Sequence, residues 1–321
     1  MVDARAPRLI RVIRLARSYR RTIRIVAAVL GVLLLLAAIV MIARQREVID
    51  AARAALHDPD WRLVAMLAGA IVGNYLLSGL MFSVLIRPFG RVGLLEMQAV
   101  VAAASLINFL PLRPGPFGRV AYHTVVNRIP VRDATRVMIE GVVMTIIAAV
   151  LLAVTVGLSR FAGTTVWIMA LTPAVLLAAM TAIDAPRRRI LLALLLRYLD
   201  VMLWAIRYIA AFALLGRELG LDAALALATI SVIATMVPFF SNGLGLREWA
   251  VGLVAPLITA HQLELGLTAE LINRAVEIFM VLILGGIAIG WLTWWKAVLP
   301  RILASPNGTP PPDEENRRTR G

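Results

Sequence analysis

Residues 105–119 read SLINFLPLRPGPFGR, and residues 238–248 read PFFSNGLGLRE. In both places a long apolar stretch breaks at a proline, and a run with glycine and arginine follows within a few residues. The residues around the two breaks also match in order, which favours an internal duplication over chance. The matching residues are Phe82, Leu85, Arg87, Gly90, Ser105, Arg136 and Glu140 in the first copy, and Phe212, Leu215, Arg217, Gly220, Ser231, Arg274 and Glu277 in the second.

The composition is that of a polytopic membrane protein. The chain has 321 residues, of which 60% are hydrophobic, and its mean hydropathy is +0.84. These values exceed those of an ordinary soluble domain. Residues 25–43 carry no charge. At about 1.5 Å per residue, such a run crosses a hydrocarbon core of roughly 30 Å. We therefore predict an all-α integral membrane protein.

The formal charge of +14 is spread over the ends of the apolar runs, and no single solvated region collects it. This pattern predicts anionic lipid head groups as partners and argues against nucleic acid. The chain has no cysteine, and His57, His123 and His261 lie far apart in no ligand spacing. We therefore expect neither a metal site nor a cofactor.

The positive-inside rule gives the orientation of the chain. Residues 1–24 contain eight arginines ahead of the first span and are predicted to be a basic cytoplasmic segment. Residues 25–303 form the predicted membrane domain, and the Pro-rich tail at 304–321 is predicted to be disordered. Because Lys296 and Arg301 follow the last apolar run, we expect both termini in the cytoplasm.

The first break predicts a hairpin that does not cross the membrane. Residues 97–112 are apolar but short for a full span. If they crossed, a basic loop would face the outside, against the positive-inside rule. A re-entrant hairpin from the cytoplasm, turning at 111–118, satisfies the charge bias, and non-helical backbone is tolerated where it lines a cavity. The basic residues concerned are Arg113, Arg119, Arg128, Arg132 and Arg136, against only Asp133.

The second break predicts a hairpin from the other side. Residues 223–237 and 249–260 are each too short to span. The stretch 261–270 carries Glu264 and Glu270 but no basic residue, which suits an external loop. Two hairpins that enter from opposite faces are typical of an inverted-topology repeat. The predicted fold has about six full transmembrane helices plus two re-entrant helical hairpins, with repeat A at about 63–158 and repeat B at about 190–296.

One segment of repeat B left two interpretations open. Arg197, Asp200, Trp204 and Arg207 are spaced by three or four residues and form one polar stripe on a helix. Either the first half of this segment lies in the membrane interface, or the stripe faces the interior of the helix bundle.

Interrupted apolar segments in corresponding positions of two halves point to the binding site of a transporter. Each break also exposes backbone N–H groups at the start of a half-helix, where the positive dipole end and a neighbouring arginine attract an anion. The guanidinium group offers a planar, bidentate contact for phosphate. We therefore predict Arg113, Arg119, Arg247 and Arg274 as head-group contacts, with the breaks at Pro111, Gly115, Gly118, Pro238, Gly243 and Gly245.

The same residues have simpler interpretations. Arg136 with Glu140, and Arg274 with Glu277, lie about one turn apart and could form ion pairs within one helix. An arginine could also extend to the interface. Three carboxylates are charge partners in this view, or alternatively carriers of protons or cations: Glu140, Glu248 and Glu277. Three asparagines are expected to satisfy loose backbone groups: Asn108, Asn242 and Asn273.

Two motifs resemble those of a known family. The run SNGLGLREW at 241–249, followed later by LINR at 271–274, looks like the second signature of the lysylphosphatidylglycerol synthase transmembrane region, a flippase-like family. PLRPGPFGR at 111–119 resembles its first signature, with Pro116 in place of an acidic residue. Gly141 follows Glu140 where the family tends to place arginine. The resemblance covers about residues 60–295.

The resemblance implies a lipid flippase or translocase in the bacterial inner membrane, acting on an anionic phospholipid or an isoprenoid-linked lipid. Some members carry a soluble aminoacyl-transferase domain. Here the stretches outside the membrane are too short for a separate catalytic fold, so lysyl transfer is not expected. The alternative is a membrane-embedded lipid-modifying transferase, with Glu248 as a base, or its accessory subunit. A separately encoded lipid-modifying enzyme is a candidate partner.

Overall fold

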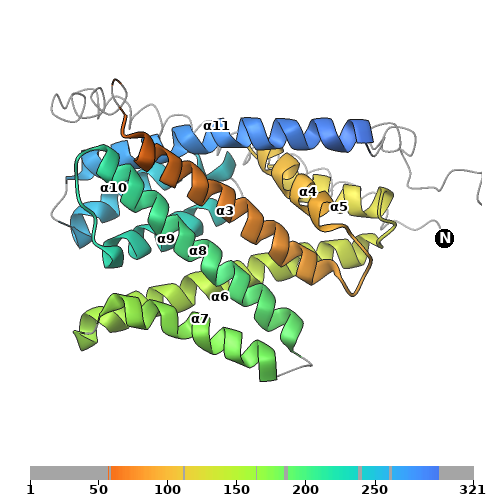
Figure 1. Cartoon of the computed structure of the whole chain (residues 1–321), viewed down its shortest axis with the longest axis horizontal. Helices are drawn as coiled ribbons and strands as arrows, with labels where there is room; N and C mark the ends of the chain where they lie inside the picture. Colours follow the sequence, from red (N-terminus) through yellow and green to blue (C-terminus); the bar gives the residue numbers. More distant parts are fainter. Residues whose placement is uncertain are drawn as a thin grey trace, which may run out of the picture.

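The computed structural model describes residues 57, 59–110, 113–163, 165–183, 187–237, 241–259 and 262–295. All regular elements in these residues are helical, and no strand occurs among them (Figure 1). The all-α prediction is therefore confirmed for this part of the chain. The predicted basic segment at 1–24, the span at 25–43 and the tail at 304–321 lie outside the described residues, as do Pro111 and Pro238.

The helices form two groups of four that are separated by α7. We call α3 to α6 the first half and α8 to α11 the second half. The first half consists of α3 (Trp61–Ile86), α4 (Leu94–Ile107), α5 (Gly115–Val125) and α6 (Val131–Ala162). Then come α7 (Val166–Ile183), α8 (Arg188–Leu214), α9 (Leu221–Met236), the 3₁₀ turn η1 (Ser241–Gly243), α10 (Leu246–Ile258) and α11 (Leu263–Trp295).

The helix lengths repeat between the halves. The first half has helices of 26, 14, 11 and 32 residues, and the second has helices of 27, 16, 13 and 33 residues. Each half thus places two short helices between two long ones. We call α4 with α5 the first hairpin, and α9 with α10 the second hairpin. The break in the sequence lies inside each hairpin.

The packing repeats in the same way. Helix α3 packs along α8, its counterpart in the other half. Helix α4 packs on α11, and its counterpart α9 packs on α6. The contacts of α6 with α8 likewise match those of α11 with α3. In Figure 1, α3 and α8 run in opposite directions, and so do α6 and α11. Each hairpin is therefore held against a long helix of the opposite half.

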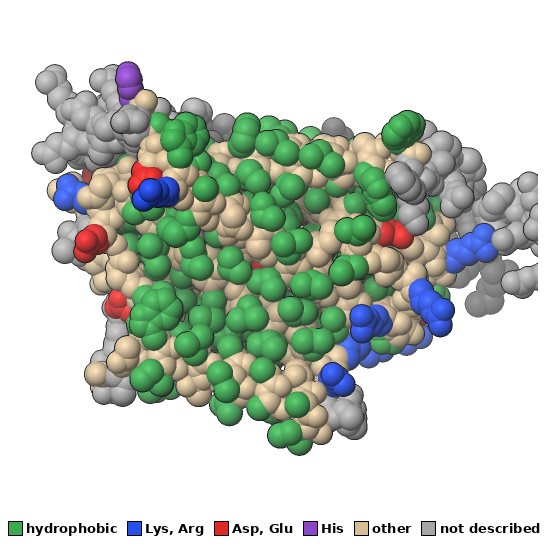
Figure 2. All heavy atoms as spheres, viewed as in Figure 1, with side chains coloured by type: hydrophobic (Ala, Val, Ile, Leu, Met, Phe, Trp, Pro, Cys, Tyr) green, Lys and Arg blue, Asp and Glu red, His purple; other side chains and the backbone are tan. Residues whose placement is uncertain are grey.

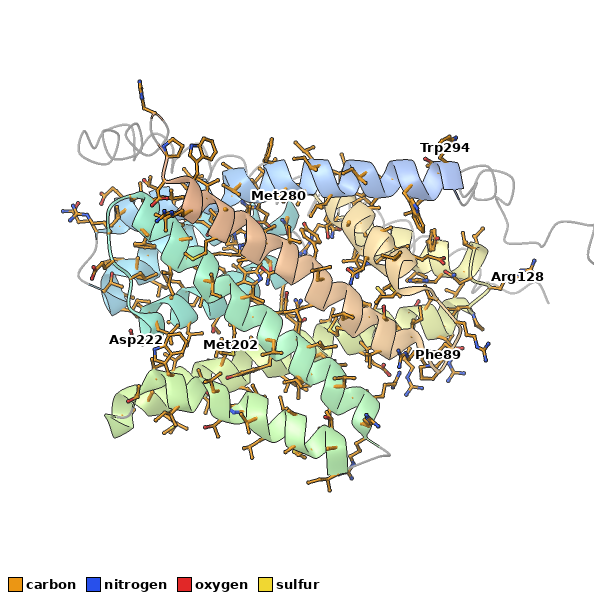
Figure 3. All side chains as sticks on the ribbon, viewed as in Figure 1. Phe89, Arg128, Met202, Asp222, Met280 and Trp294 are labelled. Carbon is orange, nitrogen blue, oxygen red and sulfur yellow. The ribbon has the colours of Figure 1, made fainter. Side chains whose placement is uncertain are left out.

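Charged residues gather at the two ends of the molecule. Phe89 and Arg128, which flank the first hairpin, lie at one end, and Asp222, at the start of α9, lies at the other (Figure 3). We call the end near Phe89 the basic end. Arg136 and Arg189 lie there over the ring of Phe89, and their neighbours along the chain add to the positive charge: Arg87, Arg91, Arg128, Arg132, Arg187 and Arg188. Figure 2 shows Lys and Arg side chains gathered at one end, and acidic and basic side chains together at the other.

The surface between the two ends is apolar. Four helices are long and apolar enough to cross a membrane: α3, α6, α7 and α11. Their outer faces expose large hydrophobic side chains, among them Val150, Leu171, Val175 and Leu282. Hydrophobic side chains cover the face seen in Figure 2 almost continuously. An apolar surface this extensive is suited to lipid and not to water. The architecture is that of a multi-pass membrane protein.

The helix boundaries correct two details of the sequence analysis. Gly118 was predicted to belong to the first break, but it lies inside α5. The stretch 261–270 was predicted to be an external loop, but α11 begins at Leu263, and Glu270 is fully buried on it. Counting charges failed here because a buried carboxylate with an arginine partner from another helix looks the same in the sequence as a solvated one.

Gly285 of α11 permits the close approach of α4. A β-carbon at this position would lie 2.6 Å from Cβ of Leu106 and 3.1 Å from the carbonyl oxygen of Ala102. We expect Gly285→Val to lower the free energy of unfolding by about 1–3 kcal/mol, because the two helices must move apart. The matched control is Gly286→Val, where a β-carbon meets no atom within 4 Å. Equal thermal unfolding midpoints for the two variants would contradict this packing.

Candidate functional site

A cavity of about 490 Å³ lies where the two halves meet. Residues from α3, α4, α5, α6 and α8, together with the end of α9, line it. Three arginines are among them: Arg113, Arg119 and Arg197. No acidic residue lines the cavity within the described part of the chain. The cavity is therefore positively charged in a molecule whose surroundings are mostly apolar.

Arg113 joins the two sequence breaks. It lies in the first break, with a left-handed backbone φ of 47°. Its Nη1 donates to the carbonyl oxygens of Thr235 at 2.5 Å and Val237 at 3.4 Å. These carbonyls are at the C-terminal end of α9, which has a negative partial charge that favours a cation. The tips of the two hairpins therefore meet at this side chain.

Arg119 lies on α5, one turn into the helix. Its guanidinium stacks over the ring of Phe82, 4.5 Å from the centroid. Its Nε is buried and has no hydrogen-bond partner. Neither Arg119 nor Arg113 forms an ion pair with a carboxylate in the described residues. Arginine in such surroundings is costly unless a ligand, water or a counter-charge accompanies it.

Arg197 reaches the cavity from α8 and is held firmly. Its Nε donates to Oγ1 of Thr145 at 2.8 Å, and its Nη1 donates to Oγ of Ser78 at 3.2 Å. The same Nη1 forms an ion pair of 2.5 Å with Asp200, which is buried. The charge of Arg197 is therefore balanced by a carboxylate, whereas Arg113 and Arg119 have no carboxylate partner in the part of the chain that the structure describes.

The first break is closed by a side chain. Oδ1 of Asn108, just after α4, accepts a hydrogen bond of 3.0 Å from the backbone N–H of Gly115, the first residue of α5. A β-carbon on Gly115 would collide with this side chain and with the carbonyl oxygen of Ala104. Asn108 thus satisfies a loose backbone group, as predicted.

The second break is closed by an arginine. Asn242, Gly243 and Gly245 all have left-handed φ values, of 48°, 71° and 78°. Nη1 of Arg274 donates to the carbonyl oxygen of Asn242 at 3.1 Å. Arg274 comes from α11, so the chain is anchored here to the opposite long helix of its own half. This contact places α10 so that its first turn is buried.

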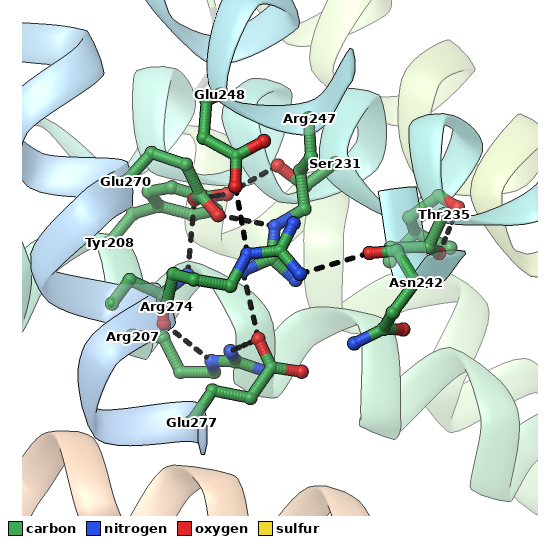
Figure 4. Close-up of polar contacts among 12 residues, drawn as sticks. Arg207, Tyr208, Ser231, Thr235, Asn242, Arg247, Glu248, Glu270, Arg274 and Glu277 are labelled. Carbon is green, nitrogen blue, oxygen red and sulfur yellow. Dashed lines mark hydrogen bonds and ion pairs between the residues drawn. The ribbon is translucent and has the colours of Figure 1, made fainter. Parts of the chain in front are cut away.

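A buried ion network surrounds the first turn of α10 (Figure 4). Arg247 is fully buried and forms ion pairs with Glu270 and, at 2.8 Å, with Glu277. Glu270 also accepts a hydrogen bond of 2.5 Å from the hydroxyl of Tyr208. Two carboxylates of α11 thus hold one arginine of α10.

The other arginines of the network have partners from different helices. Arg274 pairs with Glu248 at 2.8 Å, and Arg207 pairs with Glu277 at 3.0 Å. The alternative interpretation, an ion pair of Arg274 with Glu277 within α11, is not among the ion pairs of the described residues, because the packing of α10 and α8 brings other partners closer. Arg207 also lies over the ring of Trp204, 3.9 Å from the centroid.

The polar stripe of α8 faces the interior of the bundle. Asp200 and Arg207 are each only 2% exposed, which decides between the two interpretations of this segment. Asn74 of α3 donates to Oδ1 of Asp200 at 2.8 Å and accepts from Arg207 at 3.4 Å. Through these contacts the ion pair of Arg197 at the cavity continues into the buried network.

The predicted site residues fall into two groups. Arg113 and Arg119 line the cavity, while Arg247 and Arg274 are not among its lining residues. Glu248 and Glu277 belong to the buried network. Glu140 lies at the basic end, where it pairs with Arg136 at 3.0 Å and Arg189 at 3.2 Å. The predicted pair of Arg136 with Glu140 within one helix is therefore confirmed.

Sequence reasoning missed two important residues. Arg197 was recognised only as part of a stripe, yet it lines the cavity. Glu270 was assigned to a loop, yet it is the partner of Arg247. The usable signal for both was an ionisable side chain within an apolar segment, which marks a functional or paired position by default. Comparisons of the chain with protein-family models, curated proteins and solved structures gave no match.

Proposed function

We propose that this protein moves a lipid with an anionic head group between the leaflets of a bacterial inner membrane. The observation that carries the proposal is the cavity at the meeting point of the two breaks, where Arg113 and Arg119 have no carboxylate partner among the described residues. A membrane-embedded basic cavity suits an anionic head group because a guanidinium binds phosphate through paired, charge-assisted hydrogen bonds. The resemblance of the breaks to a flippase-like family agrees with this function.

The repeated helix pattern supports a two-sided mechanism. We infer that the halves form an inverted repeat, with α3, α6, α7, α8 and α11 as full spans and the two hairpins as re-entrant segments. Opposed directions of α3 and α8, and of α6 and α11, support this arrangement (Figure 1). The first hairpin starts from the basic end and the second from the other end (Figure 3). Such repeats allow alternating access around one central site.

The head group and the tails of the lipid have separate places in this mechanism. The head group binds to the guanidinium groups in the cavity, while the acyl chains stay along the apolar outer surface. Because Arg113 holds the end of α9, movement of either hairpin changes the shape of the cavity. The two hairpin tips are therefore the parts that we expect to move when access changes from one leaflet to the other.

The carboxylates have a structural role in this proposal. Glu248 is fully buried against Arg274, and Glu277 pairs with two arginines. Transport of protons or cations by Glu140, Glu248 or Glu277 stays a prediction. Nothing in the geometry favours the transferase alternative, because Glu248 does not line the cavity that would hold a substrate.

Topology can be tested by labelling single cysteines, since the chain has none of its own. Arg132→Cys lies at the basic end on an exposed position of α6, and Glu218→Cys is exposed near the start of α9. We expect a membrane-impermeant maleimide added to intact cells to label the second variant and not the first. Labelling of Arg132→Cys from outside would contradict the first re-entrant hairpin and the cytoplasmic basic end.

The function itself can be tested in vesicles that contain the purified protein and a fluorescent phosphatidylglycerol. A membrane-impermeant quencher reports how much label reaches the inner leaflet. We expect label to exchange between leaflets with the protein present and not in empty vesicles. Absence of exchange for anionic phospholipids and for isoprenoid-linked phosphates alike would overturn the proposal. Formation of a covalently modified lipid would instead favour a transferase.

A further inference from the structure

The charges of the cavity select among anionic head groups. We infer that the cavity binds a lipid whose head group ends in a doubly charged phosphate, in preference to a singly charged phosphodiester or an aminoacylated head group. The assumption that this phosphate belongs to a lipid rests on the proposed function. The charge preference rests on the cavity alone.

The first argument is a charge count. Three guanidinium groups line the cavity, and one of them, Arg197, is neutralised by Asp200. Arg113 and Arg119 have no carboxylate partner among the described residues, so the cavity holds two guanidinium charges without a full counter-charge. The carbonyl oxygens at the end of α9 give Arg113 only partial negative charge. A phosphomonoester is close to doubly charged above its second pKa of about 6. Its charge therefore matches that of the cavity, whereas a phosphodiester leaves one arginine unbalanced.

The second argument is the state of the two arginines without a ligand. Nε of Arg119 is buried with no hydrogen-bond partner, and Arg113 and Arg197 line the same cavity, where like charges repel one another. Within the described residues, no contact satisfies this donor. A group with several acceptor oxygens and two negative charges satisfies the donor and reduces the repulsion. The amino group of an aminoacylated lipid would add a further positive charge and increase the repulsion.

The third argument concerns the source of the phosphate. Phe117 and Val142 line the cavity and are also 69% and 52% exposed on the apolar surface. Met81, Phe82 and Met138 line its wall. A free phosphate makes no use of these apolar residues, whereas the first carbons of an acyl or isoprenoid chain can pack on them while leaving for the membrane. The cavity thus offers contacts to both parts of a lipid phosphate.

The test compares phosphatidic acid with phosphatidylmethanol of identical acyl chains, using the full chain in phosphatidylcholine nanodiscs. The two head groups differ by one methyl group and one charge at about pH 8, since the second pKa of a phosphomonoester is about 6. We expect phosphatidic acid to bind about tenfold more tightly or better, because one more charge-assisted contact is made. Lysyl-phosphatidylglycerol should bind more weakly than both. Equal affinities for phosphatidic acid and phosphatidylmethanol would overturn the inference.

Variants and a soluble competitor complete the design. Arg119→Gln should remove the preference for phosphatidic acid, while Arg188→Gln, which removes an exposed charge outside the cavity, should keep it. If inorganic phosphate displaces phosphatidic acid at equal concentration, the cavity does not prefer a lipid, and the assumption that its phosphate ligand belongs to a lipid is overturned. The comparison on the unaltered protein needs no variant, so a folding defect cannot obscure the result. Lost charge preference with intact leaflet exchange refutes this inference alone, and absent exchange with intact preference refutes the proposed function.

Discussion

Arg247→Met is expected to lower the free energy of unfolding by about 3–5 kcal/mol, the usual cost of breaking a buried ion pair on one side. Arg247 is fully buried between Glu270 and Glu277. Removing its charge leaves Glu270 buried without a cationic partner among the described residues, because the ion pair of Arg207 is with Glu277. The loss is measured by denaturant titration of the detergent-solubilised protein, followed by tryptophan fluorescence.

Two further variants show that the missing charge causes this effect. Arg247→Met combined with Glu270→Gln should recover part of the lost stability, because the network is again balanced. Arg188→Gln should unfold like the unaltered protein, since this arginine is exposed at the basic end. If Arg247→Met proves as stable as Arg188→Gln, the buried network does not hold α10 in place.

The second large effect is expected on transport. Arg119→Gln should slow leaflet exchange by about tenfold to a hundredfold, since a hydrogen bond to a charged group contributes about 1.5–3 kcal/mol. Arg119 is the cleaner choice of these two arginines because it stacks on Phe82 and forms no ion pair among the described residues. Arg113 in addition holds the end of α9. Exchange is followed by quenching of a labelled anionic lipid in vesicles.

A conservative change separates charge from structure. Arg119→Lys keeps the positive charge but loses the planar fork, so we expect partial activity from it. Unfolding midpoints of both variants should stay close to that of the unaltered protein, because no ion pair of Arg119 is broken. Exchange at the full rate in Arg119→Gln would remove Arg119 from the head-group site. Exchange at the full rate in both Arg119→Gln and Arg113→Gln would show that the cavity is not the head-group site.

Most of the helices of this protein could be predicted from the sequence. The predicted bounds of the two repeats lie within a few residues of the start of α3, the end of α6, the start of α8 and the end of α11, because a membrane helix needs about twenty apolar residues. The short apolar runs likewise gave the two hairpins. The order of matching residues around the breaks predicted a repeat, and the short helices of the two halves are similar in length. The inverted repeat itself stays a prediction.

The ion pairs were harder to predict from the sequence. Spacing along one helix suggested a pair of Arg274 with Glu277, which the contacts of α8 and α10 replace. Glu270 looked like a loop residue because its partner, Arg247, is 23 positions away. Arg197 looked like one member of a stripe, although Ser78 and Thr145 from two other helices orient it at the cavity.

The sequence by itself determined which segments are helices, where they break and at which end the positive charge lies. Each of these follows from local hydrophobicity and from charges near the helix ends. The tertiary structure alone decided which arginines have a carboxylate partner and which, among the described residues, line the cavity without one. Ion pairing in an apolar interior depends on distances of a few ångströms between side chains of different helices, and only packing sets those distances.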